Sequence, residues 1–174
     1  ARIEASYASA HPDDPAAHVA AGDAALQAGD IDGALVNFQR AAQLAPGRAD
    51  AHFGLARAYL ARSQPSEAAA EFQTVRAAEP KNIRALNGIG IAFDQLGRGR
   101  EAQNAYRTAL AIAPDDRAIR NNLGLSLVLS GDYDQAIAEL SALARQPGAT
   151  ARIRQNLALA LGLEGRSRTE AART

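Results

Sequence analysis

Proline and glycine recur along this chain with a spacing of 34 residues, and that spacing limits the fold more than any other feature. Pro46, Pro80 and Pro114 lie 34 residues apart, and a second series of turn residues keeps the same interval. That second series, with serine in one place, is Gly29, Ser63, Gly97, Gly131 and Gly165. A shared period of this length indicates stacked structural repeats, each of which buries its apolar face against its neighbours.

The composition indicates that the repeats are helical. Alanine, the best helix former, accounts for 43 of the 174 residues, whereas aromatic residues make up only 5%. Between the turn residues we therefore predict two helices per repeat, with Asp30, Asp132 and Ser66 as caps near second-helix starts. The predicted helices are 2–10, 15–28, 32–44, 49–62, 66–78, 83–96, 100–112, 117–130, 134–145 and 151–163.

Positions within each repeat resemble the tetratricopeptide repeat (TPR) family. Its small position 8 is matched by Gly22, Ala56, Gly90, Gly124 and Ala158, and its small position 20 by Ala34, Ala68, Ala102 and Ala136. Its large position 24 is matched by Phe38, Phe72, Tyr106 and Leu140. The resemblance implies an all-α, right-handed α-solenoid of antiparallel helix pairs. We expect one TPR domain over 1–174: a remnant of a preceding repeat (1–14), repeats 15–48, 49–82, 83–116 and 117–150, and a partial repeat 151–174.

Charge and cysteine content narrow the function classes. The 19 basic and 19 acidic residues balance, so no overall field would attract nucleic acid. The ends differ: residues 1–50 hold three arginines against seven acids, and residues 145–174 hold six arginines against two acids. This is either a functional charge gradient or an ordinary solvated surface. The absence of cysteine excludes disulfides and thiolate metal sites.

No residue pattern in the chain predicts catalysis or a cofactor. His18 and His52 occupy equivalent positions of adjacent repeats, but no third ligand recurs near them, so we expect no metal site. The acid pairs that follow the closing prolines, such as Asp115 and Asp116, are expected to cap the next helix rather than act as acid and base. We therefore expect a protein that is not an enzyme.

By the TPR resemblance, first helices line a concave groove that accepts an extended peptide or an amphipathic helix. The groove positions carry amides in the later repeats and become apolar toward the C-terminal half. Those amides could instead pair with neighbouring helices. The predicted groove residues are Phe53, Arg57, Asn87, Ile91, Asn121, Asn122, Leu125, Val128, Gln155, Asn156 and Leu159.

The first helices of the last two repeats, residues 121–127 and 154–163, resemble the TPR lipoproteins of Tad/Flp pilus assembly systems. This resemblance covers residues 117–165. It implies an adaptor or pilotin at the periplasmic face of the bacterial outer membrane, held by an N-terminal lipid and bound to a secretin or another assembly component. Two alternatives stay open: a general cytoplasmic TPR scaffold, or a noncatalytic TPR segment of a larger enzyme. A signal sequence with a lipidated cysteine upstream would favour the first interpretation.

Overall fold

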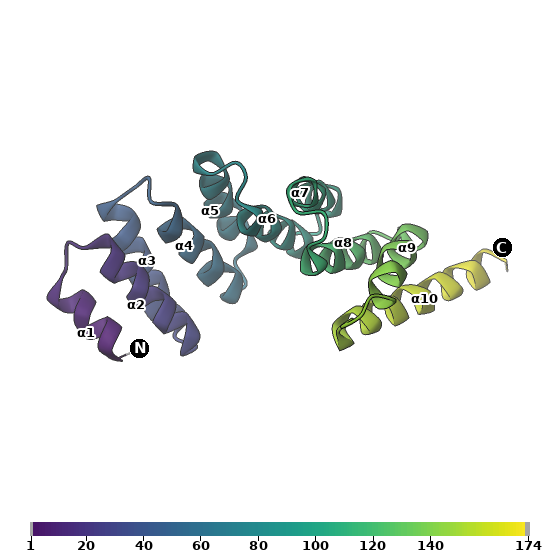
Figure 1. Ribbon diagram of the computed structural model, residues 1–174, viewed down its shortest axis with the longest axis horizontal. Helices are drawn as coiled ribbons and strands as arrows, with labels where there is room; N and C mark the ends of the chain where they lie inside the picture. The colour runs from purple at the N-terminus through teal and green to yellow at the C-terminus, as the bar shows by residue number, and fades with distance from the viewer. Residues whose placement is uncertain (1, 173–174) are drawn as a thin grey trace. The chain divides into compact units, whose positions relative to one another are not determined.

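The computed structural model describes residues 2–172, and this part of the chain is all helical, with no strand (Figure 1). Nine of the predicted helices are confirmed to within one residue at each end. The helices are α1 Arg2–Ala10, α2 Pro15–Gln27, α3 Ile31–Leu44, α4 Ala49–Ala61, α5 Pro65–Ala78, α6 Ile83–Gln95, α7 Gly99–Ile112, α8 Arg117–Leu129, α9 Tyr133–Ala144 and α10 Ala151–Ala171.

The chain forms two compact halves, residues 1–92 and 93–174, which divide within α6. In the N-terminal half, α2 packs on α1, α3 and α4, and α4 also packs on α3 and α5. In the C-terminal half, α8 packs on α7, α9 and α10, and α9 packs on α10. Both halves thus use one arrangement, in which a first helix contacts its own second helix, the preceding second helix and the neighbouring first helix.

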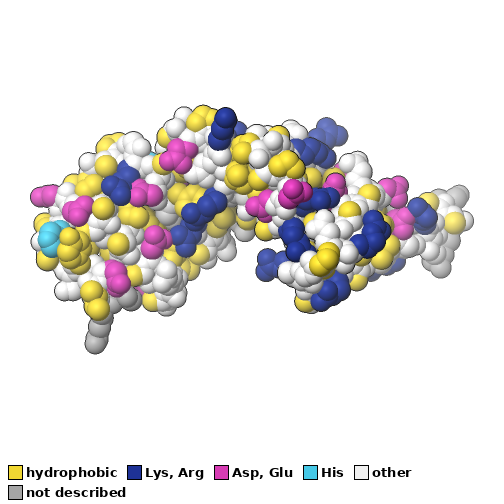
Figure 2. Space-filling view, viewed as in Figure 1, with side chains coloured by type: hydrophobic (Ala, Val, Ile, Leu, Met, Phe, Trp, Pro, Cys, Tyr) yellow, Lys and Arg dark blue, Asp and Glu magenta, His cyan; other side chains and the backbone are white. Residues whose placement is uncertain are grey.

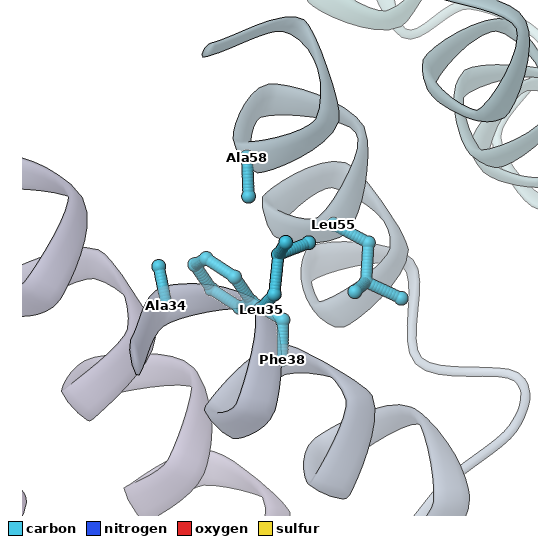
Figure 3. Packing of buried hydrophobic residues seen from close by; sticks show 5 residues of the cluster. All are labelled: Ala34, Leu35, Phe38, Leu55 and Ala58. Carbon is cyan, nitrogen blue, oxygen red and sulfur yellow. The ribbon is translucent and has the colours of Figure 1, made fainter. Parts of the chain in front are cut away.

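Phe38 shows why small residues recur where the helices cross. Its ring is fully buried between α2 and α4, in the cluster drawn in Figure 3. A Cβ atom added at Gly22 would lie 2.7 Å from a ring carbon of Phe38, and one added at Gly54 would lie 2.2 Å away. Only glycine leaves room for the ring at these two positions.

The predicted phase of the repeat is confirmed in four repeats. The large residues at position 24 are all buried, and the alanines at position 20 have no exposed surface: Phe38, Phe72, Tyr106 and Leu140; Ala34, Ala68, Ala102 and Ala136. At position 8 the fifth repeat differs from the others, because Ala158 is exposed whereas Gly22, Ala56, Gly90 and Gly124 are buried. No second helix crosses α10 at that position within the described residues.

Four of the five predicted turn residues have the left-handed backbone conformation that ends a first helix. Gly29, Gly97 and Gly131 have φ between 72° and 82°, and Ser63 has φ 59°. Asp30 caps α3 as predicted, since its carboxylate accepts a hydrogen bond from the Gly33 backbone nitrogen at 2.9 Å. The other two predicted second-helix caps are not observed.

Those two caps fail for different reasons. Ser66 lies inside α5, because Pro65 already occupies the first helical position, where its missing N–H costs nothing. Asp132 does precede α9, but its side chain makes no capping hydrogen bond. Among the acids after the closing prolines, Asp14 caps α2 and Asp116 caps α8, as predicted.

The predicted end of the last helix is wrong. Helix α10 does not stop near residue 163 but continues through Gly165 to Ala171, and it is the long helix at the C-terminal end of Figure 1. Glycine permits a left-handed turn but does not impose one. Here Arg168 pairs with Glu164 one turn earlier, which supports a continuous helix. No described helix is long and apolar enough to cross a bilayer.

Candidate protein-binding surface

In the N-terminal half, an ion pair between adjacent repeats shows how groove positions line up. Arg57 Nη1 donates to Asp23 Oδ1 at 2.7 Å, and the two residues lie 34 apart at position 9 of successive first helices. In these two repeats the position 9 side chains are therefore in contact. Both side chains remain about two-fifths exposed, so the pair is accessible to solvent.

The predicted groove residue Phe53 is partly exposed and has two neighbours of its own. Its ring meets Phe72 edge-on with a centroid distance of 5.5 Å, and the Arg84 guanidinium lies 4.4 Å from its centroid. Asn87 and Ile91 are also partly buried. The N-terminal half thus offers a mixed charged and aromatic surface.

In the C-terminal half, the groove positions are more apolar. Leu125 is partly exposed, Leu159 is 42% exposed, and Gln155 is exposed. Leu125 and Leu159 lie one repeat apart at position 9, the register in which Asp23 and Arg57 touch. We call these three side chains, Leu125, Gln155 and Leu159, the apolar strip.

Two residues predicted for the groove are buried instead. Asn121 is 4% exposed, and its Oδ1 accepts a hydrogen bond from Asn156 Nδ2 at 3.0 Å, which ties α8 to α10. For this pair the amides connect neighbouring helices, one of the two interpretations left open. Val128 is 3% exposed, because α8 is covered by three other helices and little of its surface stays open. Asn122 and Asn156 are partly buried.

The two equivalent histidines act as clamps within the stack. His52 contacts the Glu71 carboxylate at 2.6 Å through Nδ1 and the Pro46 carbonyl at 2.8 Å through Nε2. His18 makes the corresponding contacts to Asn37 and Pro12, and Arg120 pairs with Glu139 at 3.0 Å in the fourth repeat. These side chains fasten a first helix to the second helix of its repeat.

The partners of His52 determine its charge. Glu71 Oε2 and the Pro46 carbonyl are both acceptors, and this arrangement favours the charged ring, which can donate through both nitrogens. Burial alone would lower the pKa of His52, but the hydrogen bonds to Glu71 and Pro46 and the charge of Glu71 raise it above its ordinary value. No group of three metal-ligating side chains occurs in the described part of the chain.

Sequence reasoning missed a polar network around Asp94. Its carboxylate accepts hydrogen bonds from Ser126 Oγ at 2.5 Å and from the Tyr106 hydroxyl at 2.9 Å. Burial raises the pKa of Asp94, and the two hydrogen bonds lower it in part. Burial and the charge of Asp94 also raise the pKa of Tyr106. The network joins α6, α7 and α8 within the C-terminal half.

Sequence reasoning also missed a pocket of about 510 Å³ at the starts of α8 and α10. Arg117 and Arg152 bring two positive charges to it, and it is partly apolar elsewhere. Its lining residues are Arg117, Ala118, Asn121, Asn122, Gly148, Thr150, Arg152 and Ile153. The excess of arginine over acids in residues 145–174 was the one sequence signal that pointed toward this region.

Comparison with known families identifies the repeats. Two family models, both described as tetratricopeptide repeat, match residues 25–89 and 87–150, so together they cover most of the chain. The chain belongs to the tetratricopeptide-repeat family. Its repeats form a protein-interaction scaffold of helix pairs. No curated protein matches the sequence.

Two solved structures with similar folds are described as TPR proteins. A thermophilic TPR protein of Thermus thermophilus superposes with a TM-score of 0.74 at 22% identity, covering 88% of this chain and 84% of that one. YrrB, described as a TPR protein with an unusual peptide-binding site, gives 0.74 at 18% identity, covering 93% and 84%. A third similar structure, PilF of Pseudomonas aeruginosa, gives 0.75 at 25% identity, covering 91% and 72%.

Proposed function

We propose that this TPR chain is a noncatalytic adaptor that captures a segment of another protein on the apolar strip of its C-terminal half. The proposal rests on a difference in solvent exposure between positions of the repeat. Positions 20 and 24 are buried in the first four repeats, whereas Leu159 at position 9 of the fifth remains 42% exposed beside the exposed Gln155. Leu125, at position 9 of the preceding repeat, is partly exposed, and an apolar patch on the surface is typical of a site that a partner covers.

The strip suits an amphipathic helix or an extended segment. Leu125 and Leu159 would receive its apolar side chains, and the Gln155 amide, which both donates and accepts, would hold its polar edge. The related fold of YrrB is described as having a peptide-binding site, which supports peptide capture on a scaffold of this kind.

A role in Tad/Flp pilus assembly is the finer part of the proposal. It rests on the resemblance of residues 117–165 to the TPR lipoproteins of those systems. The partner would then be a secretin or another assembly component, and the protein would work at the periplasmic face of the outer membrane. The complete coding sequence tests this part: an upstream signal sequence with a lipidated cysteine supports it, and a cytoplasmic start or a fused catalytic domain contradicts it.

Replacing the two leucines of the apolar strip with glutamate tests whether the strip binds the partner. A variant that combines Leu125→Glu and Leu159→Glu places two carboxylates on the surface and should abolish capture of the partner from cell envelopes. Its helical circular dichroism should stay unchanged, because the residues that hold the stack are untouched. A matched control combines Val36→Glu and Ile112→Glu, two exposed aliphatic residues on the second helices α3 and α7.

Three outcomes separate the possibilities. Loss of capture in the strip variant but not in the control supports the proposal. Full capture by the folded strip variant rules out the strip as the binding surface. Unfolding of the strip variant would mean that Leu125 and Leu159 belong to the packed stack.

A further inference from the structure

The Asp94 carboxylate in the C-terminal half carries a charge that no basic side chain balances. Its Oδ1 accepts a hydrogen bond from Ser126 Oγ at 2.5 Å, and its Oδ2 accepts one from the Tyr106 hydroxyl at 2.9 Å. None of the ion pairs in the described part of the chain includes Asp94. Arg98, the nearest arginine along the chain, contacts an aromatic ring and pairs with a glutamate instead. Neutral hydroxyl donors alone therefore hold the carboxylate.

The Asp94 carboxylate can accept a further hydrogen bond. Two carboxylate oxygens offer about four acceptor sites, and the two hydroxyls occupy one site on each oxygen. Asp94 is partly exposed, so a donor from another molecule can reach it. Burial of a charge costs free energy unless an opposite charge compensates for it, and burial accordingly raises the pKa of Asp94. A cationic ligand would supply the charge that the folded chain does not.

Asp94 lies beside the apolar strip. It occupies position 12 of the third repeat, on the face of α6 that also carries the predicted groove residue Ile91 one turn earlier. Its partner Ser126 is fully buried and directly follows Leu125 on α8. The hydrogen bond to Ser126 thus brings the carboxylate to the part of α8 that carries Leu125. Leu129, one turn further along α8, is 65% exposed and adds an apolar side chain there.

We propose that Asp94 binds a lysine or arginine side chain of the protein segment that the apolar strip captures. The inference rests on the proposed function, because it specifies the chemistry of that segment as a basic residue beside apolar ones. The aliphatic stem of the basic side chain would lie against Leu125 and Leu129, and its charged end would donate to the carboxylate. Ser126 and Tyr106 hold the carboxylate in one orientation, so little freedom is lost on binding.

A basic side chain fits this place better than a free amino terminus or a metal ion does. An amino terminus occurs only once in a partner chain and has no aliphatic stem to cross the apolar surface. A hard metal ion requires several oxygen ligands. In the described part of the chain, no group of three metal-ligating side chains occurs. A single carboxylate held by two hydroxyls suits one hydrogen-bonding cation.

The other charges of this half do not fill the role. Figure 2 shows basic side chains gathered over the segment of α8 to α10. Several of them pair with acids of their own half, as Arg120 does with Glu139 and Arg168 with Glu164. Exposed charges are screened beyond about 8 Å at physiological salt, so distant arginines act weakly on a partner at Asp94. A local contact between Asp94 and an incoming base therefore decides the preference.

Three peptides of the sequence Leu-Ala-X-Ala-Leu, all amidated at the end, test the assignment. The first has lysine at X and an acetylated start. The second has norleucine, which lacks the ammonium group, and an acetylated start, and the third has norleucine and a free amino terminus. Affinities are measured by NMR titration. We expect the lysine peptide to bind at least about tenfold more tightly than the acetylated norleucine peptide, because hydrogen bonds to charged groups are strong.

Variants and a direct titration complete the test. Asp94→Asn keeps the size of the side chain and should remove the preference for lysine. Asp115→Asn, the matched control, removes an exposed acid of the same half and should leave the preference unchanged. In the wild-type protein, a ¹³C titration of the side-chain carboxyl follows Asp94 itself. Saturation with the lysine peptide should lower the pKa of Asp94, because a nearby positive charge favours the carboxylate, and the acetylated norleucine peptide should not.

The possible failures differ from one another. No binding of the lysine peptide, equal affinity for the two acetylated peptides, a lysine preference that survives Asp94→Asn, or an unchanged pKa of Asp94 overturns the assignment. Tighter binding of the peptide with a free amino terminus also overturns it, in favour of a chain terminus. If the strip variant loses its partner while the peptides show no lysine preference, the proposed function stands and the Asp94 assignment fails. If the strip variant keeps its partner, the proposed function fails whatever the peptides show.

Discussion

Gly54→Ala tests the packing of the stack at its tightest point. The new Cβ atom would lie 2.2 and 2.3 Å from two ring carbons of Phe38, whose ring is fully buried and also fills the space beside Gly22. The ring cannot retreat, so overpacking should cost about 3 kcal/mol, the upper end of the usual range. Alanine restores about 1 kcal/mol of helix propensity. The net loss is about 2 kcal/mol, or about 4–8 °C in melting temperature for a chain of this size.

Gly162→Ala is the matched control, because the same change in α10 meets no atom within 4 Å. It should raise stability by about 0.5–1 kcal/mol through helix propensity alone. Thermal melts followed by circular dichroism at 222 nm measure both variants. Adding Phe38→Leu should restore part of the stability lost in Gly54→Ala, because the smaller leucine side chain leaves room for the new Cβ atom. If Gly54→Ala melts at or above the wild type, the packing argument is refuted.

Two further predictions concern a turn and a pH dependence. Ser63→Gly should stabilise the chain by about 1 kcal/mol in urea denaturation, because Ser63 holds a left-handed φ of 59° that glycine adopts without strain; an unchanged midpoint would contradict this. Because the folded pKa of His52 is raised, its stabilising contribution is complete below about pH 6.5 and is lost as pH rises through the folded pKa. An NMR titration should place the pKa of His52 above 6.5 and show that Glu71→Gln lowers it, and a pKa unaffected by Glu71→Gln would disprove the clamp.

The repeat pattern was readable from sequence because steric demands recur with it. Phe38 fits against Gly22 and Gly54 only because neither residue has a side chain. Such a steric requirement makes small residues recur with the repeat, and this recurrence is visible in the sequence. The same holds for the turns at Gly97 and Gly131, whose backbone conformation favours glycine. Helix bounds follow from these constraints, which explains why nine of ten were placed to within one residue.

The features that the sequence did not predict occur at single places in the chain and do not repeat from one TPR unit to the next. The course of α10 through Gly165 is supported by one local ion pair, which does not appear in a periodic pattern. Asn121 was predicted as a groove residue, with pairing to a neighbouring helix left open, and its amide accepts a hydrogen bond from Asn156 across the helix interface. The pocket at Arg117 depends on how one side chain lies at the junction of α8 and the Pro147–Gly148 turn. Such details follow from three-dimensional packing rather than from residue type.

Site-directed photo-cross-linking tests the central claim, that the first-helix surface captures the partner, most directly. A photoreactive phenylalanine analogue replaces Leu159 in the apolar strip or, as a comparison, Val36 on the second helix α3. After irradiation in cell envelopes, adducts are identified by mass spectrometry. We expect the analogue at Leu159 to yield a single partner protein that the variant with Leu125→Glu fails to capture, and the analogue at Val36 to yield none. A partner that cross-links at Val36 and not at Leu159 would contradict the account.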